Sequence, residues 1–379
     1  MNTTFENAVQ RPIAPFRNDH VGSFLRPAAL KEARAKFAAN EITAEQLRQI
    51  EDEEIIKLVQ KQKEVGIKGV TDGEFRRSWY HLDFFWGFDG IEKKKLEQGF
   101  AFRGGQTRGE TAILSGKIDF TSHPHVEHFK FLKSVAGEGV SPKQNIPGAA
   151  HLLFELQRPG NKEITATIYP NMMDLVTDIA VAYNKAILAL YEAGCRNLQI
   201  DDCTWGLLCD PKIREAKAKE GLDINKILKM NVDLNNKTIA NLPSDLVITM
   251  HVCRGNFKSD FLAEGGYDPV AELLLGSSNV NAFYLEFDTE RAGGFEPLKH
   301  LKEDKQVVLG LFSSKHGELE DKEQIFNRIK EASKIIDISR ICISPQCGFA
   351  STEEGNILTE EQQWSKLKLI KEVADTIWQ

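Results

Sequence analysis

The chain has 379 residues, of which 41% are hydrophobic and 27% charged, a composition typical of a globular protein rather than a disordered one. Its formal charge is −7, since 48 Lys and Arg residues stand against 55 Asp and Glu residues. No clustered basic face predicts nucleic-acid binding. No stretch approaches 18 consecutive apolar residues, so we expect no membrane-spanning helix.

The first twelve residues have neither a basic start nor an apolar run, so the sequence predicts no secretory signal. Six cysteines are too few for a disulfide scaffold in a chain of this length. Without an export signal they are expected to be reduced, which leaves core, metal or catalytic roles. We therefore expect a cytoplasmic protein.

Short β-like runs alternate with longer helical patterns along the chain. Eight runs are predicted as strands, at residues 18–23, 69–73, 144–148, 197–201, 246–251, 282–286, 306–311 and 340–344. Capping boxes at Thr43 with Gln46 and at Thr359 with Gln362 predict two helix starts. Helices are predicted after Thr43 through Glu64 and over residues 172–193, 211–241, 320–336 and 360–378.

This alternation predicts an α/β fold, and eight units in one chain favour a TIM-type (β/α)8 barrel that forms a single domain over residues 1–379. The second and third runs lie too far apart for one helix. Residues 90–140 are therefore predicted to be an inserted, partly β segment, with strands at 112–120 and 128–135. The competing architecture is an open doubly wound sheet, which would want a glycine-rich phosphate loop that we do not find.

Metal-ligating residues stand at the C-terminal ends of several runs, and a barrel brings those ends to one mouth. His251 and Cys253 are two residues apart on an extended segment, so their side chains point to the same side. With Glu286 and Cys347 they would supply one imidazole, two thiolates and one carboxylate, a set that suits Zn²⁺. The alternative is a set of buried cysteines beside a hydrogen-bonded histidine.

Ligands from separate strands are more typical of a catalytic zinc centre than of a structural one. Zinc in such a site can deprotonate a bound thiol and so make a thiolate nucleophile at neutral pH. Glu286 is the ligand that we expect to give way to an incoming thiol, because sulfur suits zinc better than a carboxylate does.

The sequence resembles the catalytic C-terminal barrel of cobalamin-independent methionine synthase, in a short single-barrel form. The matching segments are His-Val-Gly-Ser-Phe at 20–24, Asp-Gly-Glu at 72–74, Gln-Ile-Asp-Asp at 199–202, His-Val-Cys at 251–253, Leu-Glu at 285–286 and Pro-Gln-Cys-Gly at 345–348. The resemblance implies a TIM-type barrel that transfers a methyl group to the zinc-bound thiolate of homocysteine, giving methionine.

The resemblance also implies roles for individual residues. The zinc ligands match His251, Cys253, Glu286 and Cys347. Ser23 matches the residue that holds the amino-acid carboxylate, and Glu74 and Asp201 match acids near the substrate ammonium, which needs charged hydrogen-bond partners. Glu74 could instead form a solvent-exposed ion pair with Arg76 or Arg77. Adjacent Asp201 and Asp202 would face opposite sides of a strand, and the match selects Asp201.

The chain departs from the family pattern in three places. It has no room for the second, N-terminal barrel that helps to form the folate site of the full-length synthases. Cys203 stands where the family has a proline. The family's loop histidine, proposed to protonate the departing folate nitrogen, is matched by Lys315, with His316 one place later. Either is predicted as the catalytic acid, although His316 could simply cap the loop.

The leading prediction is therefore a zinc-dependent methyltransferase that acts on small molecules, a homocysteine-like thiol and a methyl donor. Methyltetrahydrofolate is the first donor to consider, and a sulfonium or a methylated corrinoid on a separate donor protein is an alternative. Zinc-thiolate chemistry on another electrophile, such as an epoxide, is a second reading. A non-catalytic zinc or thiol-metabolite binder is a third. The aromatic stretch at 79–86 is interpreted as loop packing, or else as a stacking wall for a flat donor.

Overall fold

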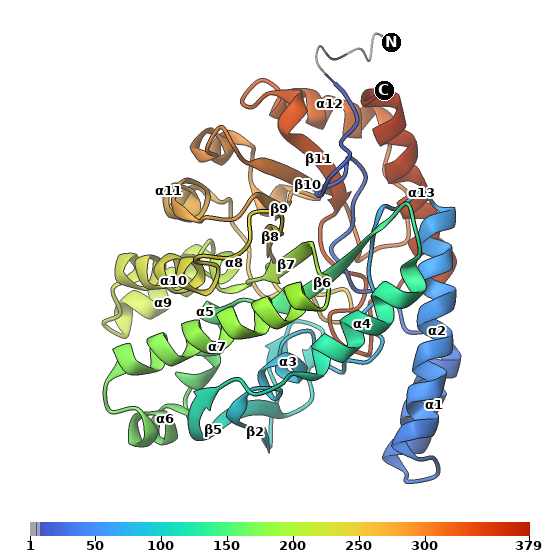
Figure 1. Cartoon of the computed structure of the whole chain (residues 1–379). Coiled ribbons are helices and arrows are strands. Elements are labelled where there is room, and N and C mark those ends of the chain that lie inside the picture. Colours follow the sequence, from blue (N-terminus) through green and yellow to red (C-terminus); the bar gives the residue numbers. More distant parts are fainter. Residues whose placement is uncertain (1–4, 6–7) are drawn as a thin grey trace.

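A computed structural model describes residue 5 and residues 8–379, so most of the first seven residues, where a secretory signal was sought, lie outside the described part (Figure 1). The strands are β1 (Gly69–Val70), β2 (Asp89–Lys95), β3 (Ala101–Phe102), β4 (Gly105–Gln106), β5 (Glu110–Asp119), β6 (Ser141–Pro147), β7 (Asn197–Asp201), β8 (Val247–Val252), β9 (Ala282–Glu286), β10 (Gln306–Phe312) and β11 (Ile341–Pro345).

The α-helices are α1 (Ala28–Ala38), α2 (Ala44–Glu64), α3 (Leu82–Phe85), α4 (Pro124–Ala136), α5 (Ala149–Leu156), α6 (Lys162–Ile168), α7 (Met172–Glu192), α8 (Thr204–Leu207), α9 (Pro211–Lys219), α10 (Ile224–Thr238), α11 (Asp268–Ser277), α12 (Lys322–Ala332) and α13 (Glu360–Ile377). Short 3₁₀ helices cover Glu290–Ala292, Glu296–His300 and Ile338–Arg340. Across the described residues, no helix combines the length and the apolar character that crossing a membrane requires.

A curled parallel sheet lies at the centre of the molecule, with helices around its outside (Figure 1). Its seven strands run in the order β1-β6-β7-β8-β9-β10-β11. Strands such as β7, β9 and β11 are buried along their whole length, as expected for parallel strands covered on both faces. The predicted α/β, TIM-barrel-like fold is confirmed.

The segment at residues 18–23, predicted as the first strand, lies between β11 and β1 without forming a regular ladder. Asn18 makes a single parallel bridge to Ile343, and the His20 ring is 2.7 Å from the Gly69 carbonyl oxygen. The Asp19 carboxylate accepts hydrogen bonds from the backbone N–H groups of Phe16 and His20. Side chains thus satisfy backbone groups that a ladder would otherwise pair.

The helices confirm most of the predicted boundaries, and both capping boxes are present. One predicted helix, at 211–241, is wrong, because the structure has two, α9 and α10. Gly221 between them has φ +80°, a left-handed conformation that ends a helix, and the Asp223 side chain caps α10.

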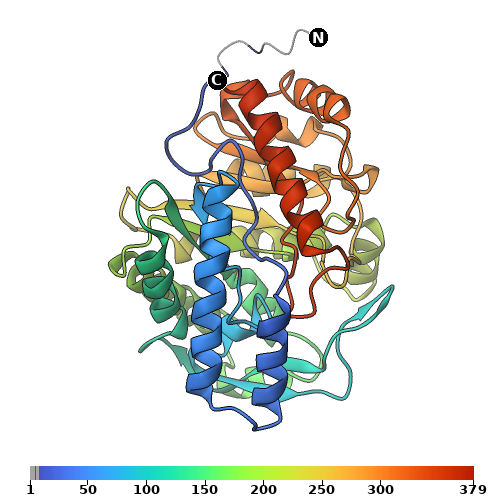
Figure 2. The same ribbon diagram turned by 90° about the vertical axis from the view of Figure 1, so that its right-hand side faces the viewer.

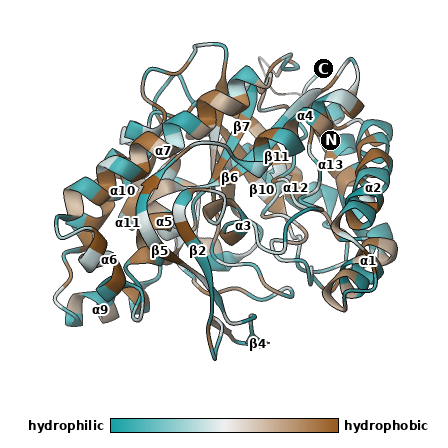
Figure 3. Ribbon diagram, turned by 60° about the horizontal axis from the view of Figure 1, so that its bottom comes forward, coloured by the Kyte–Doolittle hydropathy of each residue, from teal (hydrophilic) through white to brown (hydrophobic). Residues whose placement is uncertain are grey.

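The inserted segment is partly β, as predicted, but one of its two strands is wrongly placed. β2 and β5 form an antiparallel pair, and β3 and β4 form a small hairpin between them that projects from the body in Figure 3. Residues 128–135 belong to helix α4 instead of a strand. Phe129, Leu132 and Ala136 are buried at helical spacing, and the His123 side chain caps the helix start.

The helices bury one face each against the sheet and against one another. Figure 3 shows hydrophobic and hydrophilic residues on different sides of the helices that surround the strands. In Figure 2 the two blue helices, α1 and α2, lie beside the red α13. Lys61 of α2 lies 5.5 Å from the Trp364 ring centroid of α13. This packing holds the strands in place and leaves their C-terminal ends free to carry loops.

Candidate active site

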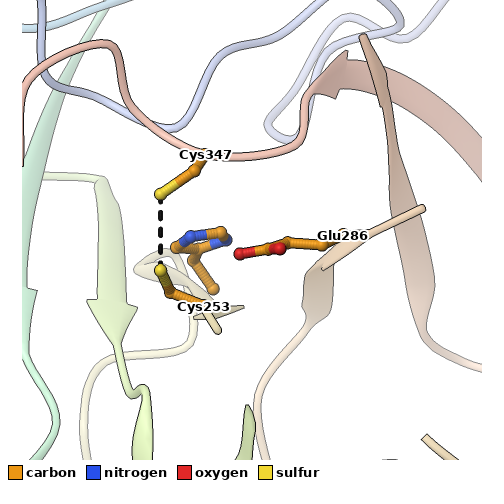
Figure 4. Close-up of side chains that lie close together, drawn as sticks. Cys253, Glu286 and Cys347 are labelled. Carbon is orange, nitrogen blue, oxygen red and sulfur yellow. Dashed lines mark hydrogen bonds between the residues drawn. The ribbon is translucent and has the colours of Figure 1, made fainter. Parts of the chain in front are cut away.

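Four side chains of types that can ligate a metal meet at the C-terminal ends of strands β8, β9 and β11. His251 lies at the end of β8 and Cys253 just after it, Glu286 is the last residue of β9, and Cys347 follows β11. One ligand atom from each of them lies within 4.8 Å of all the others. Figure 4 shows the two sulfurs facing each other, with the Glu286 carboxylate pointing into the same space. The four groups could hold a metal ion.

The two cysteines and the histidine lie close together, and each influences the pKa of its neighbours. The sulfurs of Cys253 and Cys347 are 3.5 Å apart. The hydrogen bond from Cys253 lowers the pKa of Cys347 well below its usual range, with help from His251, although burial opposes this. The Nδ1 atom of His251 is 3.2 Å from the Tyr284 carbonyl oxygen. That carbonyl can only accept, so Nδ1 carries the proton. The buried Nε2, which has no hydrogen-bond partner in the described part of the chain, is left as a ligand atom.

Glu286 is fully buried and stays ionised. Its two oxygens accept hydrogen bonds from the backbone N–H of Arg254 at 2.9 Å and from the Arg291 guanidinium at 3.0 Å. Burial alone would raise the pKa of Glu286, but the charges of Arg291 and Arg254 lower it. A carboxylate, a low-pKa sulfur and a free imidazole nitrogen in one small space suit a divalent cation.

A cavity adjoins this four-ligand cluster. Of the cluster, His251, Cys253 and Cys347 line it, and Glu286 does not. The three predicted substrate-binding residues line the same cavity, namely Ser23, Glu74 and Asp201. Residues that are far apart in the sequence are thus gathered around one space, as expected for the mouth of a barrel.

Ser23 stands next to the loop that carries Cys347. Its hydroxyl accepts a hydrogen bond from the backbone N–H of Ala350 at 3.2 Å. A Cβ atom at Gly348 would lie 2.0 Å from the Ser23 hydroxyl oxygen, so the close approach of the two loops requires glycine there. This explains the glycine that follows the cysteine in the Pro-Gln-Cys-Gly segment.

Glu74 is buried in the cavity wall rather than paired in solvent. Its Oε1 is 3.6 Å from Arg77, and its Oε2 has no hydrogen-bond partner among the described residues. Arg76 contacts Glu51 and Asp52 instead. Burial raises the pKa of Glu74 to about 7, against the lowering effect of Arg77. An incoming cation would find here a carboxylate with one unused oxygen.

Asp201 and Asp202 face different sides, as predicted for neighbours on a strand. Asp201 lines the cavity, and burial raises its pKa, which His251 and two amide hydrogen bonds oppose. Asp202 accepts hydrogen bonds from the Thr204 hydroxyl and from Asn235 of α10. Asp202 therefore ties the strand end to a helix, and Asp201 remains available to a ligand.

The two predicted catalytic acids lie outside the cavity lining. The Nζ of Lys315 is buried and donates hydrogen bonds to Asn256 at 2.9 Å and to the Asp260 carbonyl oxygen at 3.0 Å. His316 is exposed. Lys315 thus secures the loop that follows Cys253. The roles of Lys315 and His316 in proton transfer stay predictions.

The predicted site residues do not include several residues of the cavity wall, although the stretch at 79–86 is interpreted from the sequence as loop packing or else as a stacking wall. Tyr80 lies 3.3 Å from both the His151 ring and the Cys203 sulfur, and the His81 and His151 rings stack at 4.7 Å. Phe100 and Phe102 reach the cavity from the inserted hairpin. The aromatic stretch after Glu74 is the sequence feature that points to Tyr80 and His81. Some residues of this stretch line the cavity, and others pack in the core.

The fold and the site define a barrel protein with a candidate metal centre beside a small-molecule cavity. A profile of the family "Cobalamin-independent synthase, Catalytic domain" matches residues 170–375. The uncharacterised protein YxjH of Bacillus subtilis is 48% identical over 96% of this chain and 95% of its own length.

Two solved structures are similar over nearly the whole chain. One, a candidate vitamin-B12-independent methionine synthase from Listeria monocytogenes, is 41% identical, with a TM-score of 0.78 over 97% of this chain and 100% of its own. The other, a B12-independent methionine synthase from Shewanella sp. W3-18-1, is 18% identical, with a TM-score of 0.72 over 95% and 96%, and it shows the fold alone. The chain belongs to the cobalamin-independent methionine synthase family of methyltransferases.

Proposed function

We propose that this protein transfers a methyl group to the thiol of homocysteine, giving methionine, with zinc held by His251, Cys253, Glu286 and Cys347. The observation that carries the proposal is a single cavity that three of these ligands share with Ser23, Glu74 and Asp201. A thiol at one end of the substrate and an amino acid at the other would each find matching chemistry there. The family's substrates, a thiol and a methyl donor, are small molecules of this kind.

The donor set supports zinc over harder cations. Two sulfurs, one imidazole nitrogen and one carboxylate oxygen suit a borderline-soft, tetrahedral ion, whereas magnesium and calcium prefer oxygen. When bound, zinc supplies a Lewis acid that lowers the pKa of a thiol ligand. Glu286 has two protein partners, Arg254 and Arg291, that can hold its carboxylate when another donor takes its place.

The amino-acid end of the substrate would be bound by hydrogen bonds to charged groups, whereas the thiol end would be bound by the metal. Asp201 and the unused oxygen of Glu74 would accept from the α-ammonium, whose positive charge favours their ionised forms. Ser23 would hold the α-carboxylate. The Shewanella relative, whose structure is a complex with selenomethionine, is consistent with an amino-acid ligand in this fold.

The methyl donor is the open part of the proposal. A 5-methyltetrahydrofolate-type donor is our first choice, and its nitrogen would need a proton as it departs. Lys315 and His316 would reach that nitrogen only if their loop moved, since neither lines the cavity. A sulfonium donor would leave as a neutral sulfide and would need no acid. A methylated corrinoid, an epoxide electrophile and a non-catalytic thiol binder are the remaining alternatives.

The experiment is to load the protein with zinc, add homocysteine with each donor in turn, and measure methionine by mass spectrometry. We expect methionine with one donor and none after zinc is removed. Binding of zinc and homocysteine without turnover of any donor would favour the non-catalytic alternative. Turnover of a thiol without an amino-acid group at the same kcat/KM as homocysteine would favour the other electrophiles.

A further inference from the structure

Two buried carboxamides, Asn145 of β6 and Gln199 of β7, meet beside Asp201. They are direct partners in the parallel register of the two strands, so their side chains lie on the same face of the sheet. Gln199 and Asp201 are two residues apart on one strand and share that face as well. The sheet therefore places both amides against the carboxylate that the proposed function assigns to the substrate ammonium.

Each amide group bridges the same two acceptors. The Nδ2 of Asn145 donates to the Val21 carbonyl oxygen at 2.6 Å and to Asp201 at 3.2 Å. The Nε2 of Gln199 donates to the Val21 carbonyl oxygen at 2.6 Å and to the other Asp201 oxygen at 2.6 Å. Both oxygens of the Asp201 carboxylate are thereby tied to the chain segment that leads into Ser23.

The orientation of the two amides follows from the chemistry of their neighbours. A carbonyl and a carboxylate can only accept, so both amides must present their NH₂ groups. Their own oxygens, Asn145 Oδ1 and Gln199 Oε1, are buried and have no partner among the described residues. An amide that served only the core would be expected to pair both of its groups. These two instead direct their donors at Asp201 and Val21.

The turn at 21–23 packs closely against the amide side chains of Asn145 and Gln199. Gly22 has φ +142°, and a Cβ atom there would lie 2.4 Å from the Asn145 amide nitrogen, so only glycine lets the turn approach. Ser23 follows at once and is bonded to Ala350, beyond Cys347. The two amides thus fix the distance between Asp201 and the turn that presents Ser23.

We propose that Asn145 and Gln199 are positioning residues for substrate selection, which hold Asp201 and the 21–23 turn at the separation that an α-amino acid group requires. The inference rests on the proposed function, in which Asp201 binds the ammonium and Ser23 the carboxylate. Neither amide lines the cavity, so both act through the residues that they hold. The result is a site that prefers a thiol with an amino-acid group over a simple thiol.

The test measures thiol binding, without a methyl donor, on protein in which cobalt replaces zinc. Homocysteine and 2-mercaptoethanol are titrated separately, and the thiolate-to-cobalt absorption band reports sulfur ligation. Asn145→Leu and Gln199→Met remove the donors with little change in volume. Each variant should bind homocysteine about tenfold more weakly or worse, with unchanged affinity for 2-mercaptoethanol.

A matched control is Asn235→Leu, which removes the amide that serves Asp202 on the far side of the strand. It should keep the wild-type preference for homocysteine. Variants of Asn145 and Gln199 that keep that preference, or that weaken both thiols equally, would overturn the positioning role. A wild-type protein with no preference for homocysteine would instead overturn the proposed function itself. If Asn145→Leu does not fold, Gln199→Met alone decides the question.

Discussion

The cavity has two walls of contrasting construction. The clamp wall consists of Ser23, Glu74, Asp201 and the three cluster residues that line the cavity, His251, Cys253 and Cys347, most of which stand at strand ends or in the loops after them. The aromatic wall consists of Trp79, Tyr80, His81, Phe100, Phe102, His151, Phe154 and Phe257, which come from loops, helix α5 and the inserted hairpin. Charge is concentrated in the clamp wall.

The polar groups of the aromatic wall are held neutral. Burial raises the pKa of the Tyr80 hydroxyl well above its usual range and lowers the pKa of His151 to about 3. Those of the clamp wall include a low-pKa sulfur and the carboxyl groups of Glu74 and Asp201. A charged substrate end would therefore be bound by the clamp wall, and an uncharged, flat group by the aromatic wall. The predictions below separate the two.

The largest effect is expected from Cys347→Ser, in the clamp wall. A serine hydroxyl is a poor zinc ligand, so the variant should lose stoichiometric zinc, measured by metal analysis, and all methyl transfer, while its circular dichroism spectrum is unchanged. Cys195→Ser is the matched control, because Cys195 is also buried but lies two residues before β7, at the end of that strand opposite to the cluster. Full zinc content in Cys347→Ser would remove Cys347 from the ligand set.

Asp201→Asn is expected to weaken homocysteine binding by about 10- to 100-fold, the effect of removing one charged hydrogen-bond partner. Zinc content should be unchanged, since Asp201 is not part of the four-ligand cluster. Isothermal titration calorimetry on the zinc-loaded protein measures the loss. Unchanged homocysteine affinity would contradict the role of the clamp wall.

Phe102→Ala tests the aromatic wall. Phe102 lies at the hairpin tip, with its ring centroid 5.2 Å from that of Phe257. Removing the ring should raise the KM for the methyl donor by about two- to tenfold, the usual effect of losing one aromatic contact. The affinity for homocysteine should be unchanged. Steady-state kinetics with whichever donor yields methionine measure the KM, and isothermal titration calorimetry measures the homocysteine affinity. A loss of homocysteine affinity instead would mean that the two walls do not divide the substrates.

Acid should weaken the fold through the buried imidazoles. Burial lowers the pKa of His20 and His123 to about 4 and that of His151 to about 3. These histidines bind protons near pH 6.5 in the unfolded chain but only near pH 3 to 4 in the folded chain. Their contribution to the free energy of unfolding is therefore complete above about pH 6.5 and is lost as the pH drops toward about 4. The melting temperature of the metal-free protein should decrease from pH 7 to pH 5, and a constant value would contradict this account.

The clamp wall could be predicted from the sequence because strand ends are easy to locate. An apolar run that ends in a ligand-type residue places that residue at the mouth of a barrel, and His251 and Glu286 follow this rule, while Cys347 stands two residues after its strand. The capping boxes were equally visible, since both are set by residues three positions apart.

The aromatic wall could not be predicted in the same way. Phe100 and Phe102 reach the cavity through an inserted hairpin whose path depends on tertiary contacts such as the one between Phe102 and Phe257. The helix at 124–136 was assigned partly to a strand because its β-branched and aromatic residues outweighed the helical spacing. The segment at 18–23 was wrongly predicted as a regular strand. Its backbone is satisfied by side-chain hydrogen bonds, and these leave no mark in the hydrophobic pattern of the sequence.

The most direct test of the central claim is zinc-edge X-ray absorption on the protein before and after homocysteine is added. We predict two sulfur ligands at about 2.3 Å in the protein alone and three when homocysteine is bound, with one oxygen ligand lost. A sulfur count that stays at two after homocysteine is added would contradict the claim that this cluster binds the substrate thiol.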